Sequence, residues 1–102
     1  MALYNLEPTS ETAIVIGDYL QQKGQYAEAL KYLNAAIANE EDPDRKLSLT
    51  LSIAGSELGS GNARSAADYA RRAISLNPES GYGYYILAQS YASGINGCSG
   101  FN

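Results

Sequence analysis

Histidine and tryptophan are both absent from this 102-residue chain, and cysteine and methionine occur once each. Without histidine there is no Ser-His-Asp or Cys-His arrangement, no imidazole-ligated zinc and no imidazole base near neutral pH. The single cysteine, Cys98, excludes a disulfide within the chain and a zinc site built from several thiolates. These absences argue against most classes of enzyme.

Basic residues are also few, because seven Lys and Arg against eleven Asp and Glu give a formal net charge of −4. An acidic chain with no basic run is a poor match for nucleic acid or an anionic membrane surface, so we expect neither as a partner. No apolar run approaches the roughly 18 residues of a membrane-spanning helix. The length and the 45% hydrophobic content suit one small folded domain, and nothing in the sequence assigns a cellular compartment.

What the chain does contain is fifteen alanines and nine tyrosines. Alanine favours helices and lets them approach closely, and tyrosine can bury its ring while its hydroxyl stays in water. This composition favours a thin stack of helices over a globule with one thick core.

An apolar stripe at helical spacing occurs twice. The first copy comprises Tyr26, Ala29, Leu30, Leu33, Ala36 and Ile37, and 37 residues later the second comprises Ala63, Ala66, Ala67, Ala70, Ala73 and Ile74. A repeat of this length predicts a helical solenoid.

Capping and turn residues predict five helices. We expect the first to run from about Ser10 to Gly24, the second from 25 to 38, and the third to begin at Pro43 after an Asp42 cap. The third should end within 59–62, the fourth should span about 63–76, and the fifth should span about 80–93.

The pattern resembles the tetratricopeptide repeat, whose unit of about 34 residues is a pair of antiparallel helices. The residues that carry the likeness are Gly17, Gly24, Tyr26, Ala29, Leu33 and Ala36 in a first unit, Ala54, Gly61, Ala66, Ala73 and Pro78 in a second, and Tyr84, Leu87, Ala88 and Tyr91 in a third. The resemblance covers about 10–93 and implies an all-α fold, a right-handed superhelical stack of about two and a half units. The units would be 10–43, 47–80 and a partial 81–93.

The two ends lie outside these units. Residues 1–9 are interpreted as the close of a preceding unit or as a linker, and the glycine-rich residues 94–102 as a flexible tail. Because the fifth helix has no partner helix in this pattern, we expect a fragment of a longer repeat protein. The alternative is a small protein whose fifth helix is its own cap.

No group of residues has the spacing of a catalytic, cofactor or metal site. The acidic residues within 40–44 lack the spacing of a calcium loop and are interpreted as a solvated helix cap. Gly59 and Gly61 precede no lysine and so form no phosphate loop, and Cys98 has no base beside it. We therefore expect no enzyme and no cofactor.

In tetratricopeptide repeats the first helices of the units line a concave groove that receives a peptide. The resemblance therefore implies a non-catalytic scaffold that binds a peptide or protein segment. The lining would consist of Glu11, Ile14, Val15, Asp18, Gln21, Gln22, Ser48, Leu51, Ser52, Gly55, Leu58, Tyr82, Tyr85 and Gln89. For the leucines and Ile14, ordinary packing between repeats is an equally good interpretation. For Tyr82 and Tyr85, contact with a further helix or the next unit is equally good.

Some family members hold the C-terminal carboxylate of a chaperone with lysine, arginine and asparagine on these helices. Ile14, Asp18 and Tyr82 stand at three of those positions here, and no cation falls among the lining residues. We therefore expect no binding of acidic chaperone tails and a preference for neutral or weakly basic peptides.

The fifth helix also suggests a second function, self-assembly into a homodimer. Three of its large residues are expected to pack on the fourth helix: Tyr84, Leu87 and Tyr91. The exposed patch would then be Tyr82, Tyr85 and Ile86. Such a patch tends to find a partner surface, and the same patch on a second copy supplies one.

Overall fold

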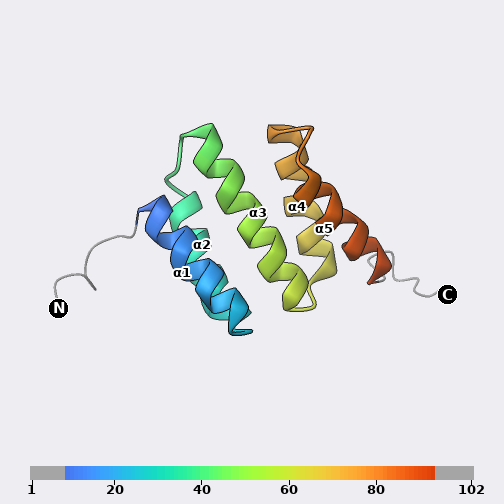
Figure 1. Cartoon of the computed structure of the whole chain (residues 1–102), viewed down its shortest axis with the longest axis horizontal. Helices are drawn as coiled ribbons and strands as arrows, with labels where there is room; N and C mark the ends of the chain where they lie inside the picture. Colours follow the sequence, from blue (N-terminus) through green and yellow to red (C-terminus); the bar gives the residue numbers. More distant parts are fainter. Residues whose placement is uncertain (1–8, 94–102) are drawn as a thin grey trace.

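A computed structural model describes residues 9–93 of the chain. These residues form five helices and no strand: α1 (Ser10–Gln22), α2 (Tyr26–Ile37), α3 (Pro43–Gly59), α4 (Ala63–Leu76) and α5 (Gly81–Ala92) (Figure 1). The helix bounds agree closely with the sequence-based expectation, and the all-α stack is confirmed. The interpretations of 1–8 and 94–102 as a preceding unit and a tail fall outside the described residues.

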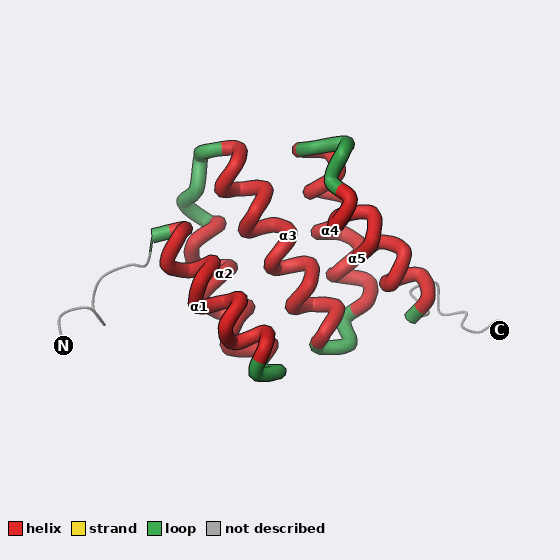
Figure 2. The backbone as a smooth tube through the Cα atoms, viewed as in Figure 1, coloured by secondary structure: helices red, strands yellow, loops and turns green. Residues whose placement is uncertain are grey.

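The five helices form two layers of antiparallel neighbours joined by short loops (Figure 2). One layer consists of α1, α3 and α5, in which α3 packs against both of the others. The second layer consists of α2 and α4, which pack on α3 but not on each other (Figure 1). The central helix α3 therefore contacts all four other helices.

Local chemistry explains where the helices begin and end. The side chains of Thr9, Asp42 and Ser80 accept hydrogen bonds from backbone N–H groups three residues on, at 3.2, 3.0 and 3.1 Å. These caps satisfy N–H groups that have no partner within the helix. Gly24 and Gly61 have φ angles of 79° and 90°, a conformation that glycine adopts without steric cost.

The core consists of two clusters that meet around α3. The first comprises Ala13, Ala29, Leu33, Ala36, Leu49 and Ile53, and the second comprises Ala54, Ala66, Ala70 and Ile86. Tyr69 on α4 packs against both clusters, so its ring connects the two. Alanine supplies much of this core, which agrees with a thin stack of closely spaced helices.

The packing face of α5 differs from the expected one. Ile86 was expected to be exposed, but it is completely buried in the second cluster. Tyr84 was expected to pack on α4, but it is 51% exposed. Tyr91 contacts Arg71 of α4 through its hydroxyl and ring, as expected, but it is still 45% exposed. Leu87 alone of the expected packing residues is partly buried against the core.

The cause of this difference is the size of the side chains on either side of Ile86. Gly83 and Ser90 lie one turn before and one turn after it, and both are buried. A Cβ on Gly83 would lie 3.2 Å from Ile74 Cγ1, so the absence of a side chain there lets α5 approach α4 closely. From the sequence we expected the largest residues of α5 to be buried. The observed packing buries the face with the smallest residues, because only that face lets α5 approach α4 closely.

No helix within the described residues is both long enough and apolar enough to cross a membrane.

Candidate functional site

The helices α1, α3 and α5 share one face of the molecule, which we call the α1–α3–α5 face. Nearly all of the residues predicted to line a peptide site lie on these helices and are exposed or partly exposed: Glu11, Ile14, Asp18, Gln21, Gln22, Ser48, Leu51, Ser52, Gly55, Leu58, Tyr82, Tyr85 and Gln89. Ile14 and Leu58 pack in part against the two core clusters, so helix packing accounts for both. The peptide-binding role of this set stays a prediction.

Gln21 connects α1 to α3 on this face. Its Nε2 atom donates hydrogen bonds to the backbone oxygen of Ser52 at 2.7 Å and to Oγ of Ser56 at 2.5 Å. Ser56 is completely buried, so the amide of Gln21 provides a partner for a hydroxyl that has no access to water. The two helices are therefore held in a defined relative position beside the site.

Gly55 on α3 makes room for a tyrosine that reaches across from α5. A Cβ built on Gly55 would stand 2.9 Å from the hydroxyl oxygen of Tyr82 and 3.6 Å from Nε2 of Gln21. The Tyr82 hydroxyl therefore lies over the backbone of α3 and near the α1 side chain. Residues from all three helices meet at this point.

Tyr82 and Tyr85 form a stacked pair on α5, which we call the tyrosine pair. Their ring centroids are 6.0 Å apart with an interplanar angle of 14°. The two side chains are 49% and 55% exposed, so about half of each is available to a partner. Burial of its other half raises the pKa of Tyr82, and Tyr85 and the negative charge of Asp18 raise that pKa further.

A cation outside the predicted lining, Arg45, lies at the opposite end of this face. Arg45 Nη1 is 3.8 Å from Oε2 of Glu11, so a cation borders the predicted lining although none belongs to it. The sequence did contain a signal, because Arg45 precedes Ser48 and Ser52 by three and seven residues, which is the spacing of one helix face. The packing of α1 on α3 then brings it beside Glu11.

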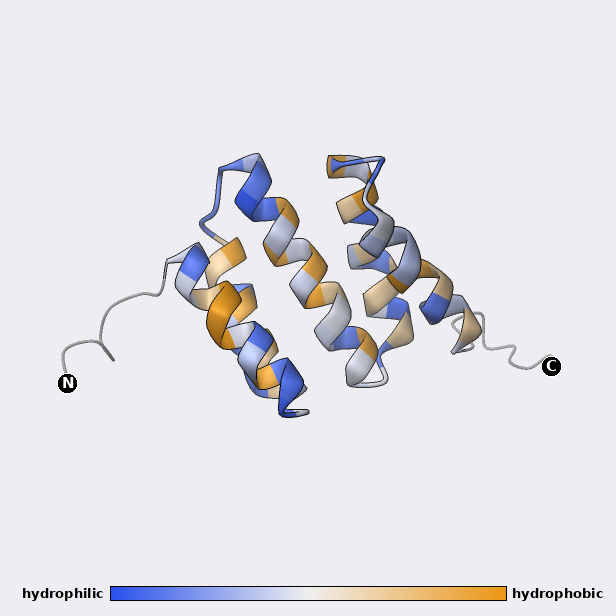
Figure 3. Ribbon diagram, viewed as in Figure 1, coloured by the Kyte–Doolittle hydropathy of each residue, from blue (hydrophilic) through white to orange (hydrophobic). Residues whose placement is uncertain are grey.

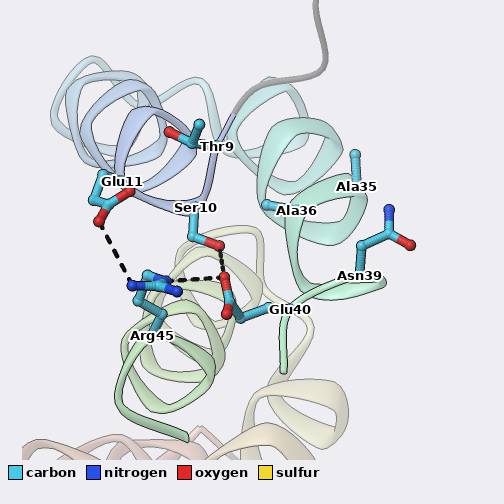
Figure 4. A pocket seen from close by; sticks show the side chains of 8 residues that line it. All are labelled: Thr9, Ser10, Glu11, Ala35, Ala36, Asn39, Glu40 and Arg45. Carbon is cyan, nitrogen blue, oxygen red and sulfur yellow. Dashed lines mark hydrogen bonds and ion pairs between the residues drawn. The ribbon is translucent and has the colours of Figure 1, made fainter. Parts of the chain in front are cut away.

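Glu40, in the hydrophilic loop between α2 and α3 (Figure 3), anchors that loop to α1. Its Oε1 atom accepts hydrogen bonds from the hydroxyl of Ser10 and from Nε of Arg45 at 3.2 Å (Figure 4). Its Oε2 atom accepts a hydrogen bond from the backbone N–H of Asp42 at 2.8 Å. These three donors, Ser10 first, lower the pKa of Glu40 from 4.5 to about 2. With its side chain only 10% exposed, Glu40 is not the solvated acid that the sequence suggested.

A hollow of about 420 Å³ adjoins this cluster (Figure 4). It is lined by Thr9, Ser10, Glu11, Ala35, Ala36, Asn39, Glu40 and Arg45. Its charged groups are already paired with one another, since Arg45 contacts both Glu11 and Glu40. The cluster therefore acts as a structural connection between α1, α2 and α3.

Val15, also predicted to line the site, borders a second hollow. Its side chain is 69% exposed and lines a separate hollow of about 650 Å³ between α1 and α2, together with Tyr19 and Tyr32. Val15 also follows Glu11 by four residues and precedes Gln22 by seven, so it shares their side of α1. Its assignment to the peptide site therefore stays a prediction.

The described residues contain no group of three or more His, Cys, Asp and Glu side chains that could hold a metal ion. Cys98, the other reactive candidate, lies outside the described range.

Two layers of antiparallel helices in tandem define a helical repeat protein. The family model of the tetratricopeptide repeat matches residues 14–50 and 51–94, which is most of the chain. The chain therefore belongs to the tetratricopeptide repeat family, whose general role is non-catalytic protein–protein interaction. No curated protein and no solved structure matches the chain.

The two matched ranges begin inside α1 and inside α3. The matched ranges therefore begin and end at different residues from the expected units 10–43 and 47–80. The boundaries of those units stay a prediction.

Proposed function

We propose that this chain is a scaffold that binds an extended peptide or protein segment across the α1–α3–α5 face. The observation that carries the proposal is the tyrosine pair, two aromatic side chains that are each about half exposed on this face. Tyrosine offers a large contact area at a low cost in conformational entropy, and it is enriched among the residues that dominate binding. The general role of the family in protein interaction supports the same conclusion.

The rest of the face suits an extended backbone. Gln22, Ser48 and Gln89 are exposed and carry amide or hydroxyl groups that can donate to and accept from peptide groups. An extended peptide leaves its backbone N–H and C=O groups unpaired, so such side chains can provide partners along its length. Polar groups flanking an aromatic centre resemble the rim and core of a typical interface.

Peptides selected from a random display library test this proposal. We expect the selected peptides to shift backbone amide NMR signals of α1, α3 and α5, and we expect Tyr85→Ser to weaken their binding about tenfold. Tyr32→Ser is the matched control, because this tyrosine is 37% exposed but lies in the hollow between α1 and α2. Shifts centred on α2 and α4, or a selection that yields no peptide, would contradict the proposal.

Acidic C-terminal tails are not expected to bind. Arg45, the cation at the edge of the face, is already engaged by Glu40 and Glu11. A synthetic peptide ending in Glu-Glu-Val-Asp should give no saturable binding in a fluorescence anisotropy titration. Tight binding of that peptide would show that Arg45 exchanges its partners for the tail.

A second candidate function is self-association through the tyrosines of α5. The observation in its favour is that Tyr82, Tyr84, Tyr85 and Tyr91 are each 45–55% exposed on one helix. Ile86 is excluded from this surface because it is buried. Light scattering over a concentration series should show a dimer that Tyr84→Lys converts to a monomer. A chain that is monomeric at millimolar concentration would remove this candidate.

A further inference from the structure

We propose that the α1–α3–α5 face recognises an arginine side chain of the bound segment, whose guanidinium lies on the tyrosine pair and pairs with Asp18. This inference rests on the proposed function, because it names the chemistry of the peptide that the face takes. Five residues on three helices carry it: Asp18 and Gln21 on α1, Gly55 on α3, and Tyr82 and Tyr85 on α5.

Asp18 lies on the same side of α1 as Gln21, which it precedes by three residues, or about one turn. Gln21 in turn lies beside the position that the Tyr82 hydroxyl occupies over Gly55. The carboxylate of Asp18 is exposed, and within residues 9–93 it takes part in no ion pair. Burial, then Tyr85, and then the charge of Asp18 raise the pKa of the Tyr82 phenol, so the Asp18 carboxylate acts on this ring.

Elsewhere in this chain, Lys and Arg side chains lie over tyrosine rings in cation–π contacts. The contacts are Lys23 over Tyr19 at 5.5 Å, Arg71 over Tyr91 at 5.8 Å and Arg72 over Tyr69 at 4.6 Å from the ring centroid. Within the described range, no Lys or Arg lies over Tyr82 or Tyr85. The tyrosine pair therefore offers two nearly parallel ring faces beside an unpaired carboxylate, and a cation from another chain suits both groups.

Arginine fits these groups better than lysine does. The guanidinium is planar, so it can stack on a ring while its edge donates two hydrogen bonds to one carboxylate. An acidic side chain would instead face Asp18 and be repelled. At the other end of the face Glu11 is paired with Arg45, so of the two acids in the predicted lining Asp18 alone has no ion pair within residues 9–93.

The test uses synthetic peptide pools that share one fixed central residue and have random flanks. The central residue is arginine, its neutral isostere citrulline, lysine or glutamate. We expect the chain to bind the arginine pool about tenfold more tightly than the citrulline pool, with lysine between them and glutamate weakest. The difference in affinity between the arginine pool and the citrulline pool should decrease from 50 mM to 500 mM salt, because an exposed ion pair contributes part of that difference.

Two substitutions link that preference to the named residues. Asp18→Asn should remove the preference for arginine over citrulline. Gly55→Ala places a Cβ 2.9 Å from the Tyr82 hydroxyl and should displace that ring, which lowers the preference without loss of helix content by circular dichroism. Asp68→Asn is the matched control, because this acid is exposed on α4 and contacts Arg71.

The outcomes separate this inference from the proposed function. Equal binding of the arginine and citrulline pools, or a preference that survives Asp18→Asn, would overturn the inference and leave peptide binding intact. Strongest binding of the glutamate pool would overturn it as well. If none of the pools binds, both the inference and the proposed function fail.

Discussion

Gly17 in the middle of α1 lies directly against Leu33 of α2. A Cβ at position 17 would stand 2.8 Å from Cδ2 and 2.9 Å from Cγ of Leu33, closer than packed carbon atoms approach. Leu33 is completely buried in the first core cluster, so its side chain has little room to move aside. The spacing of the first helix pair therefore depends on the absence of a side chain at position 17.

Gly17→Ala should lower the free energy of unfolding by about 1–2 kcal/mol. Overpacking of a core costs about 1–3 kcal/mol, and alanine recovers up to about 1 kcal/mol of helix propensity. Urea denaturation followed by circular dichroism measures the change. Gly81→Ala is the control, because no atom lies within 4 Å of its Cβ, and it should leave stability equal or slightly higher.

The alanines of α4 should not tolerate larger side chains. Ala66 and Ala73 are completely buried, so Ala66→Leu or Ala73→Leu should each cost about 1–3 kcal/mol of stability. Ala27→Leu, at an exposed position on α2, should leave the thermal midpoint nearly unchanged. A buried-site variant that melts like the parent would show that α4 packs through another face.

Glu40 should make the stability of the fold depend on pH in the acid range. Its pKa is lowered to about 2, so its ionised form stabilises the folded state above about pH 4.5, and this contribution is lost as the pH falls towards 2. Glu40→Gln should therefore be less stable than the parent at neutral pH and should lose less stability between pH 4.5 and 2. Denaturation curves at several pH values measure both effects. Glu41→Gln, at an exposed neighbouring position, should follow the parent.

Asp42 should contribute to stability as the N-cap of α3. Its Oδ2 atom accepts a hydrogen bond from the backbone N–H of Arg45 at 3.0 Å, so Asp42→Ala should cost about 1 kcal/mol. Asp42→Asn keeps an oxygen acceptor at the same place and should retain most of that stability. Equal losses in the two variants would indicate that charge, and not the cap hydrogen bond, is the source of the effect.

The positions of the helices could be predicted from the sequence because they depend on local chemistry. The cap at Asp42 and the turns at Gly24 and Gly61 act within about four residues of the chain. The apolar stripes repeat at helical spacing, so the existence and order of the five helices followed from them. The same stripes carried the resemblance to the repeat family, which the family match confirms.

The contacts between helices could be decided only by the tertiary structure. Ile86 is buried because Gly83 and Ser90 let α5 approach α4, and Arg45 meets Glu11 because α1 packs on α3. Such contacts depend on the spacing of two helices, which the small residues on both of them set together.

The candidate site shows the same division between sequence and structure. The sequence by itself determined which residues α1, α3 and α5 contain. The tertiary structure placed Tyr82 over Gly55 and beside Gln21, because packing brings three helices that are distant in sequence within reach of one side chain.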